Sequence, residues 1–133
     1  MSEANLQSNV VKYLKLQYPD AIYCASLGGQ YQRYISQRNK AKSTGYVKGF
    51  PDLGIYEPNK QGYHGLFLEI KQKGGYPTKE QKNWIEKLNK RGYYACCVKG
   101  LDSIMKVIDD YMNGTISNEK SKCEATKDKQ GTQ

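Results

Sequence analysis

The sequence predicts a single α/β domain in which helices flank a central mixed β-sheet. Three amphipathic helical patterns are separated by short apolar runs bounded by turn residues, as is typical of strands. The chain has 133 residues, enough for one sheet with covering helices but not for two hydrophobic cores. We expect the domain to occupy residues 1–113. Residues 114–133 have almost no large apolar side chains and should form a disordered polar tail.

The charge of the chain indicates the kind of partner. Lysine and arginine number 21 against 13 acidic residues, which gives a net charge of +8. Such an excess suits a polyanion, and nucleic acid fits better than a membrane surface. No run approaches the roughly 18 apolar residues of a membrane span, and the polar N-terminus lacks the features of a secretion signal. We therefore expect a cytoplasmic protein without a membrane partner.

The four cysteines are predicted to be reduced and structural. Cys96 and Cys97 are adjacent, which is not a metal-ligand spacing, and neighbouring strand residues point to opposite faces. The other two, Cys24 and Cys123, are far away in the sequence.

The first element is an amphipathic helix over residues 3–18, which Pro19 ends. Ser2 is a suitable N-cap. Glu3 falls in the first turn, where the helix dipole favours a carboxylate. The apolar stripe of this helix should pack on the sheet and consists of Leu6, Val10, Val11 and Leu14.

A short strand at 21–25 leads into a basic and aromatic segment, 30–49, that contains no acidic residue. Its positive charges could neutralise phosphates while its tyrosines stack on bases or wedge into a distorted duplex. The alternative is a solvated helix face whose charge serves solubility. The candidate nucleic-acid residues are Tyr31, Arg33, Tyr34, Arg38, Lys40, Lys42 and Lys48.

Two apolar runs, 52–56 and 66–71, are joined by a turn-rich connector and predict an antiparallel hairpin. If Tyr56 pairs with Gly65, Asp52 lies opposite Glu69, with Cβ atoms about 5 Å apart. Strand alternation then places Glu69 and Lys71 on one face and turns Ile70 toward the core.

Two carboxylates this close repel each other unless a cation neutralises them, and hard ions such as magnesium prefer carboxylate oxygens. The hairpin alone is compatible with two interpretations of the paired carboxylates. One is a divalent metal site; the other is an ordinary cross-strand charge cluster in which Lys71 compensates Glu69.

The second half of the chain predicts helix, strand and helix. Thr78 and Gln81 have the spacing of a capping box, and Gly92 fits the position just after the helix that they begin. A strand at 93–98 and a helix at 101–112 follow. His64, the single histidine, is expected to be exposed or to stabilise its loop.

Pro51-Asp52 followed after sixteen residues by Glu69-Ile70-Lys71 resembles the PD-(D/E)XK nuclease signature. The flanking residues sharpen this likeness, because they are similar to those of the VRR-NUC branch, the virus-type replication and repair nucleases. The similarity extends from about Glu3 to about Val98. The flanking residues are Lys48, Gly49, Phe50 and Leu53 before the signature, and Thr78, Gln81, Trp84, Leu88 and Gly92 after it.

The resemblance implies a restriction-endonuclease-like fold and a catalytic set of Asp52, Glu69, Lys71 and Gln81. Magnesium or manganese would be held by Asp52, Glu69 and the main-chain carbonyl of Ile70. In the family a glutamate near the start of the first helix completes the metal site, and Glu3 matches that position, so its role as a ligand or as a helix-terminus charge stays open. Gln81 likewise could serve the cap, the active site or both.

The function expected from this resemblance is metal-dependent endonucleolytic hydrolysis of DNA in replication, recombination or repair. Small standalone viral relatives resemble Holliday-junction resolvases that act as homodimers, so branched or junction DNA and a homodimer are the expected partners of this phage or bacterial protein. Two alternatives are a restriction-like or nicking nuclease and an accessory protein that binds DNA without cutting it.

Overall fold

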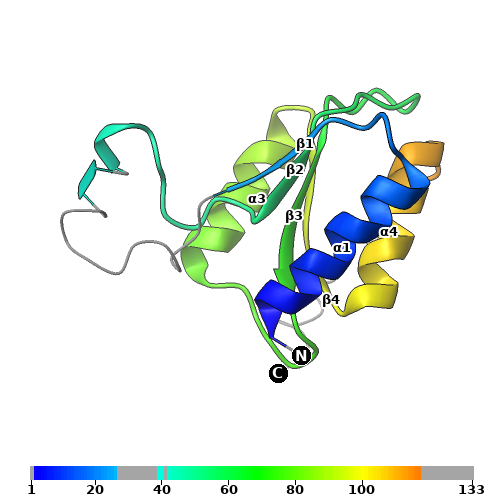
Figure 1. Ribbon diagram of the computed structural model, residues 1–133. Coiled ribbons are helices and arrows are strands. Elements are labelled where there is room, and N and C mark those ends of the chain that lie inside the picture. The colour runs from blue at the N-terminus through cyan, green and yellow to red at the C-terminus, as the bar shows by residue number, and fades with distance from the viewer. Residues whose placement is uncertain (1, 27–38, 41, 118–133) are drawn as a thin grey trace, which may run out of the picture.

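The computed structural model describes residues 2–26, 39–40 and 42–117. A four-stranded sheet in the order β1-β2-β3-β4 lies between helices (Figure 1). The pairs β1/β2 and β2/β3 are antiparallel and β3/β4 is parallel, so the predicted mixed sheet and α/β class are confirmed. The elements are α1 (Glu3–Gln17), β1 (Tyr23–Ala25), β2 (Leu53–Ile55), β3 (Leu66–Lys71), α3 (Lys79–Lys90), β4 (Tyr94–Lys99) and α4 (Leu101–Asn113).

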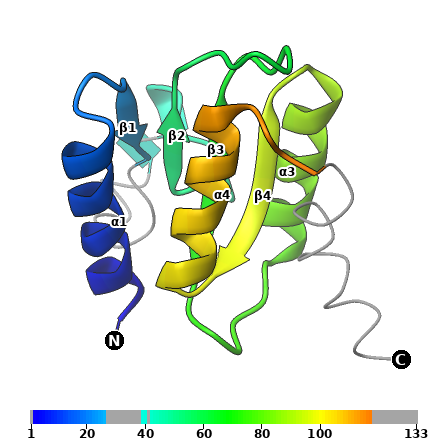
Figure 2. The same cartoon turned by 90° about the vertical axis from the view of Figure 1, so that its right-hand side faces the viewer.

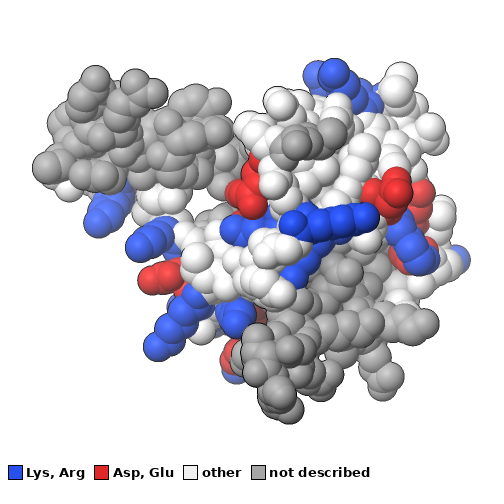
Figure 3. Space-filling model, turned by 90° about the horizontal axis from the view of Figure 1, so that it is seen from below, with Lys and Arg blue, Asp and Glu red and all other residues white. Residues whose placement is uncertain are grey.

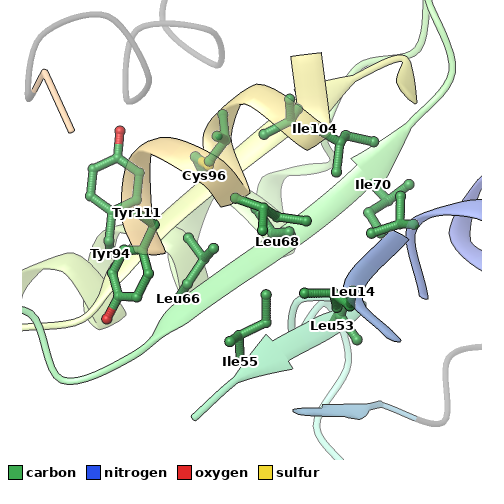
Figure 4. Packing of buried hydrophobic residues seen from close by; sticks show 14 of the residues in the cluster. Leu14, Leu53, Ile55, Leu66, Leu68, Ile70, Tyr94, Cys96, Ile104 and Tyr111 are labelled. Carbon is green, nitrogen blue, oxygen red and sulfur yellow. The ribbon is translucent and has the colours of Figure 1, made fainter. Parts of the chain in front are cut away.

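The helices divide between the two faces of the sheet. Helices α1 and α4 cover one face and α3 covers the other (Figures 1 and 2). The α1/α4 face is the larger core, and its packing is shown in Figure 4. Alternate residues of β3 serve the two faces, because strand side chains point up and down in turn: Leu66, Leu68 and Ile70 join the larger core, whereas Phe67 joins the smaller one under α3.

Local signals in the sequence fix the helix ends. The Ser2 hydroxyl accepts a hydrogen bond from the Asn5 N–H at 3.1 Å and caps α1. Thr78 and Gln81 form the predicted capping box at the start of α3. Gly92 follows α3 with a φ of +91°, a left-handed conformation that glycine adopts without steric cost.

The predicted register of the hairpin is confirmed, since Leu53 pairs with Leu68 and Gly54 with Phe67. The first strand is shorter than predicted. It begins at Tyr23 because the Ala21 N–H closes the turn after α1 by donating to the Tyr18 carbonyl at 3.0 Å.

The packed domain extends beyond the boundary predicted at residue 113. Ile116 is buried, and its N–H donates to Oε1 of Gln61 at 3.0 Å. One apolar side chain in a polar stretch is therefore enough to dock the segment that follows α4. Residues 118–133, for which disorder was predicted, lie outside the described residues.

The described cysteines carry thiol groups and are not in disulfides. Cys96 packs in the α1/α4 core and Cys97 under α3, on opposite faces of β4 as predicted, while Cys24 is exposed. Cys123 lies outside the described residues. None of the helices in the described part of the chain is both long and apolar enough to cross a membrane.

Candidate active site

Asp52 and Glu69 meet where β2 begins beside β3. The hairpin register, continued by one residue beyond the Leu53–Leu68 pair, places the two acidic residues opposite each other. Oδ2 of Asp52 accepts a hydrogen bond from the Ile70 N–H at 2.8 Å. The Asp52 carboxylate therefore takes the place of a main-chain partner at the end of the ladder, which fixes it beside Glu69.

Two further side chains contact the Glu69 carboxylate. The Lys71 ammonium lies 3.6 Å from Oε2 of Glu69. The Gln81 amide donates to the same oxygen at 2.9 Å. Gln81 also accepts from the Thr78 N–H at 2.7 Å through its Oε1. Gln81 thus contacts both the cap of α3 and Glu69, and the four residues predicted to be catalytic lie together.

Glu69 is buried, with 2 % of its surface exposed. Burial disfavours the charged form, and the nearby Asp52 adds its negative charge and a hydrogen bond, so the pKa of Glu69 rises to about 9. Lys71 opposes this rise, and Glu3 adds the smallest contribution to it. One lysine at 3.6 Å does not offset burial and a second carboxylate.

The donor set fits a hard divalent cation. Oε1 of Glu69 is buried and has no hydrogen-bond partner among the described residues, while Oε2 accepts a hydrogen bond from Gln81 and forms an ion pair with Lys71. A buried oxygen without a partner is costly, and a cation beside it would remove that cost and the repulsion from Asp52. The alternative interpretation, a charge cluster in which Lys71 compensates Glu69, gives this oxygen no partner.

The third carboxylate predicted for the metal site, that of Glu3, does not form a cluster with the other two among the described residues. Glu3 is exposed at the start of α1, and its charge reaches Glu69 only weakly. Within residues 2–26, 39–40 and 42–117, no three or more histidine, cysteine or acidic side chains form a group that could hold a metal ion. Ligation by Glu3 and by the Ile70 carbonyl stays a prediction.

The basic segment is described only in part. Lys40, Lys42 and Lys48 are exposed, and Asn39, Lys40, Lys42 and Ser43 are helical. Trp84 of α3 donates from Nε1 to the Lys48 carbonyl at 3.1 Å, which ties the end of this segment to the helix that carries Gln81. The other predicted nucleic-acid residues, Tyr31, Arg33, Tyr34 and Arg38, lie outside the described residues.

Ser26, for which no sequence pattern predicts a role, lies close to the site. Its N–H donates to the Asp52 carbonyl at 2.9 Å and continues the β1/β2 pairing, so Ser26, Asp52 and Glu69 lie in one row across three neighbouring chain segments. No local pattern could have identified Ser26, because the pairing joins segments separated by the whole basic segment.

A family model for the VRR-NUC domain matches residues 2–101, three quarters of the chain and every residue of the site. The chain belongs to the VRR-NUC family. A solved structure described as a "VRR_NUC domain protein" is similar, with 32% sequence identity and a TM-score of 0.70. The similarity covers 84% of this chain and 88% of that one. No curated protein sequence shows significant similarity.

Membership of the VRR-NUC family identifies the chain as a protein of nuclease type, with DNA as the implied partner. The likeness also agrees with the observed α/β fold. The matched region begins before α1 and ends at the first residue of α4, so it includes the whole sheet and α3.

Proposed function

We propose that this VRR-NUC protein is a divalent-metal-dependent DNA endonuclease that hydrolyses phosphodiester bonds. The observation that carries the proposal is the buried Glu69 carboxylate, which faces Asp52 and keeps one oxygen without a partner among the described residues. Burying the Glu69 carboxylate beside the partly buried Asp52 is costly, and it is useful where a cation is to be bound.

Asp52 and Glu69, with the Ile70 carbonyl and Glu3 as further candidate ligands, would hold magnesium or manganese. When bound, such an ion supplies Lewis acidity toward the phosphate and lowers the pKa of a coordinated water. The hydrogen bond from the Ile70 N–H to Asp52 holds one carboxylate at the site. The hydrogen bond from Gln81 holds the other.

Lys71 is the cation that the chain itself supplies to the reaction. Its side chain is 13% exposed and lies beside Glu69, so its ammonium group is positioned with little freedom. We assign it to orienting the attacking water and to countering the negative charge that develops on the phosphate. By resemblance to the family the products are a 3′-hydroxyl and a 5′-phosphate.

We further propose that the substrate is branched DNA, such as a four-way junction, and that the active form is a homodimer. Small standalone relatives in viruses resemble structure-specific resolvases of this kind. A junction presents two related scissile phosphates, and a two-fold dimer presents two matching sites. Exposed Lys40, Lys42 and Lys48 would position the DNA through its backbone, so that its shape rather than its sequence is recognised.

The test is a labelled panel of linear, forked, flapped and four-way DNA incubated with magnesium, manganese or a chelator. Asp52→Asn, Glu69→Gln and Lys71→Ala should each lower cleavage by about 10³-fold or more, because each removes part of one site. DNA affinity should change little, and the chelator should stop cleavage by the wild type. Cleavage at the wild-type rate by any of the three variants would overturn the assignment.

Calorimetry with magnesium separates the nuclease from a DNA-binding accessory protein. The nuclease should bind the ion at a site that Asp52→Asn removes. Lys90→Gln is a matched control, since Lys90 is an exposed residue paired with Glu86 at the far end of α3. Absence of a site that depends on Asp52, together with binding of DNA, would favour the accessory protein. A preference for linear duplexes would instead favour a restriction-like or nicking nuclease.

A further inference from the structure

Tyr76 presents an aromatic ring at the surface next to the ends of the parallel strands. The ring is held by a lysine, since Nζ of Lys99 lies 3.9 Å from its centroid. A cation over one face of a tyrosine ring is attracted by the ring electrons and fixes its orientation. Tyr76 is nevertheless 58% exposed, so much of the ring stays available for another contact.

The loop that carries Tyr76 is anchored at both ends. The Gly75 N–H donates to the Gln72 carbonyl at 3.0 Å in a tight turn, and Gly74 adopts a positive φ of +87° that favours glycine. On the other side, Pro77 is buried and Thr78 caps α3. The ring is therefore preorganised, which lowers the entropic cost of a contact with a ligand.

The register of the sheet places this ring beside the active site. Lys99 pairs with Lys71 across β3 and β4, and neighbouring strands are about 5 Å apart. Lys71 and Lys99 lie two residues beyond Glu69 and Cys97, so alternation turns all four toward the same face. The loop itself also passes close to Lys71, because a Cβ added at Gly75, the residue before Tyr76, would lie 3.5 Å from Cβ of Lys71. The Tyr76 ring therefore lies at the end of the sheet where Lys71 is located.

Two further lysines, Lys71 and Lys73, lie close to Lys99 or to its neighbour Gly100. The Lys73 side chain packs over Gly100, where an added Cβ would lie 3.4 Å from its Cε atom. Viewed from below, lysine and arginine side chains gather across the middle of the described surface (Figure 3). Lys71, Lys73 and Lys99 can accompany a strand of phosphates past Tyr76.

An aromatic side chain at a protein surface can stack only on a base whose face is uncovered, and the interior of a duplex offers no such base. We therefore propose that Tyr76 and Lys99 form a stacking platform for an unpaired nucleotide next to the scissile phosphate. This inference rests on the proposed nuclease function and gives it a source of preference for branched DNA, where unpaired nucleotides occur at the branch.

The experiment uses a forked DNA with 2-aminopurine at the first unpaired position beside the branch, and a fully paired duplex of the same sequence. Binding is measured in the full chain carrying Asp52→Asn, so that the DNA stays intact. The fork should lose 2-aminopurine fluorescence on binding because of stacking. Adding Tyr76→Ala should abolish this loss and weaken binding of the fork about tenfold, with less than about a twofold effect on the duplex.

Tyr76→Trp should keep the stacking signal, which shows that the aromatic ring is required. Lys99→Gln should weaken binding of the fork and lower its salt dependence by about one counterion. Two controls should leave the fluorescence change intact: Lys90→Gln, and Leu16→Ala, which shortens an apolar side chain that is 79% exposed near the end of α1. Circular dichroism of each variant checks the fold.

Two results would overturn the platform: full fluorescence loss with Tyr76→Ala, or equal weakening on fork and duplex. Failure of the nuclease proposal gives a different result. The wild-type chain would then leave all DNA uncut in magnesium or manganese, while the stacking signal that depends on Tyr76 persists.

Discussion

The two faces of the sheet are formed by the same strands but differ in composition. Toward α1 and α4, β3 presents Leu66, Leu68 and Ile70, and the buried cluster on that side contains no charged residue. Toward α3 the same strand presents Phe67 and then Glu69, the one charged residue that is buried in the described part of the chain. One face thus has no charged residue in its buried cluster, while the other carries a buried carboxylate at its edge.

The difference shows how a small domain can contain an unfavourable site. A fully buried leucine or isoleucine contributes about 1.5–3 kcal/mol by leaving water. A buried carboxylate with an unpartnered oxygen costs free energy instead. The α1/α4 face therefore supplies stability, and the α3 face can hold charged groups at the separation that binding of an ion requires.

Leu68→Ala tests the apolar face and should have the largest effect on stability. Leu68 of β3 is fully buried between the sheet and the helices α1 and α4. The change therefore removes apolar contacts and leaves a cavity. We expect the free energy of unfolding to fall by about 2–5 kcal/mol in urea denaturation. Leu16→Ala, on an exposed side chain, should change it by less than about 0.5 kcal/mol. Similar losses for the two variants would remove the distinction between core and surface.

Glu69→Gln tests the other face and should change stability in the opposite direction. Because the pKa of Glu69 is raised to about 9 in the folded chain from 4.5, its ionisation destabilises the fold. Without metal, the free energy of unfolding should fall as pH rises from about 4.5 to 9, since the unfolded chain loses its proton first. At pH 8 the variant should be more stable, on the order of 1–3 kcal/mol.

Urea denaturation in a chelator across this pH range is the measurement. The Glu69→Gln profile should lack the contribution from this group. If the free energies of unfolding of the wild type and Glu69→Gln changed with pH in parallel, Glu69 would be ionised in the folded chain without cost. The two faces of the sheet would then not differ in the way described.

Gln81→Ala should have the smallest effect on stability. It separates the role of Gln81 in capping α3 from its role in positioning Glu69. It removes both the return hydrogen bond of the capping box and the bond to Glu69. We expect a loss of about 1 kcal/mol in stability and about a tenfold loss of cleavage, because Glu69 loses its orientation. Thr78→Ala is the matched control. It removes the other half of the box and should cost similar stability while cleavage stays near wild type.

Gln81→Ala with unchanged cleavage would show that the bond to Glu69 serves only the fold. Equal losses of cleavage in both variants would mean that the position of α3, and not the amide of Gln81, is what the site requires.

The sequence by itself determined which strand residues face each side of the sheet, where the helices begin and end, and that Asp52, Glu69 and Lys71 lie in one site. Strand alternation separated Ile70 from Glu69 and Lys71, and the pairing predicted for the hairpin brought Asp52 opposite Glu69. The Thr78–Gln81 spacing gave the start of α3. These features depend on neighbours within a few residues or across one short connector, so local backbone geometry is sufficient to fix them.

Only the tertiary structure decided how deeply Glu69 is buried, how weakly the charge of Glu3 acts on it, and that Lys99 holds the ring of Tyr76. It also decided that the hydroxyls of Tyr13 and Tyr18 both donate to Asp109, at 2.6 Å, where α1 packs on α4. These contacts join residues from distant parts of the chain. Their distances follow from how helices and strands pack, and hydrophobic packing is not directional, so no periodicity or spacing in the sequence specifies them.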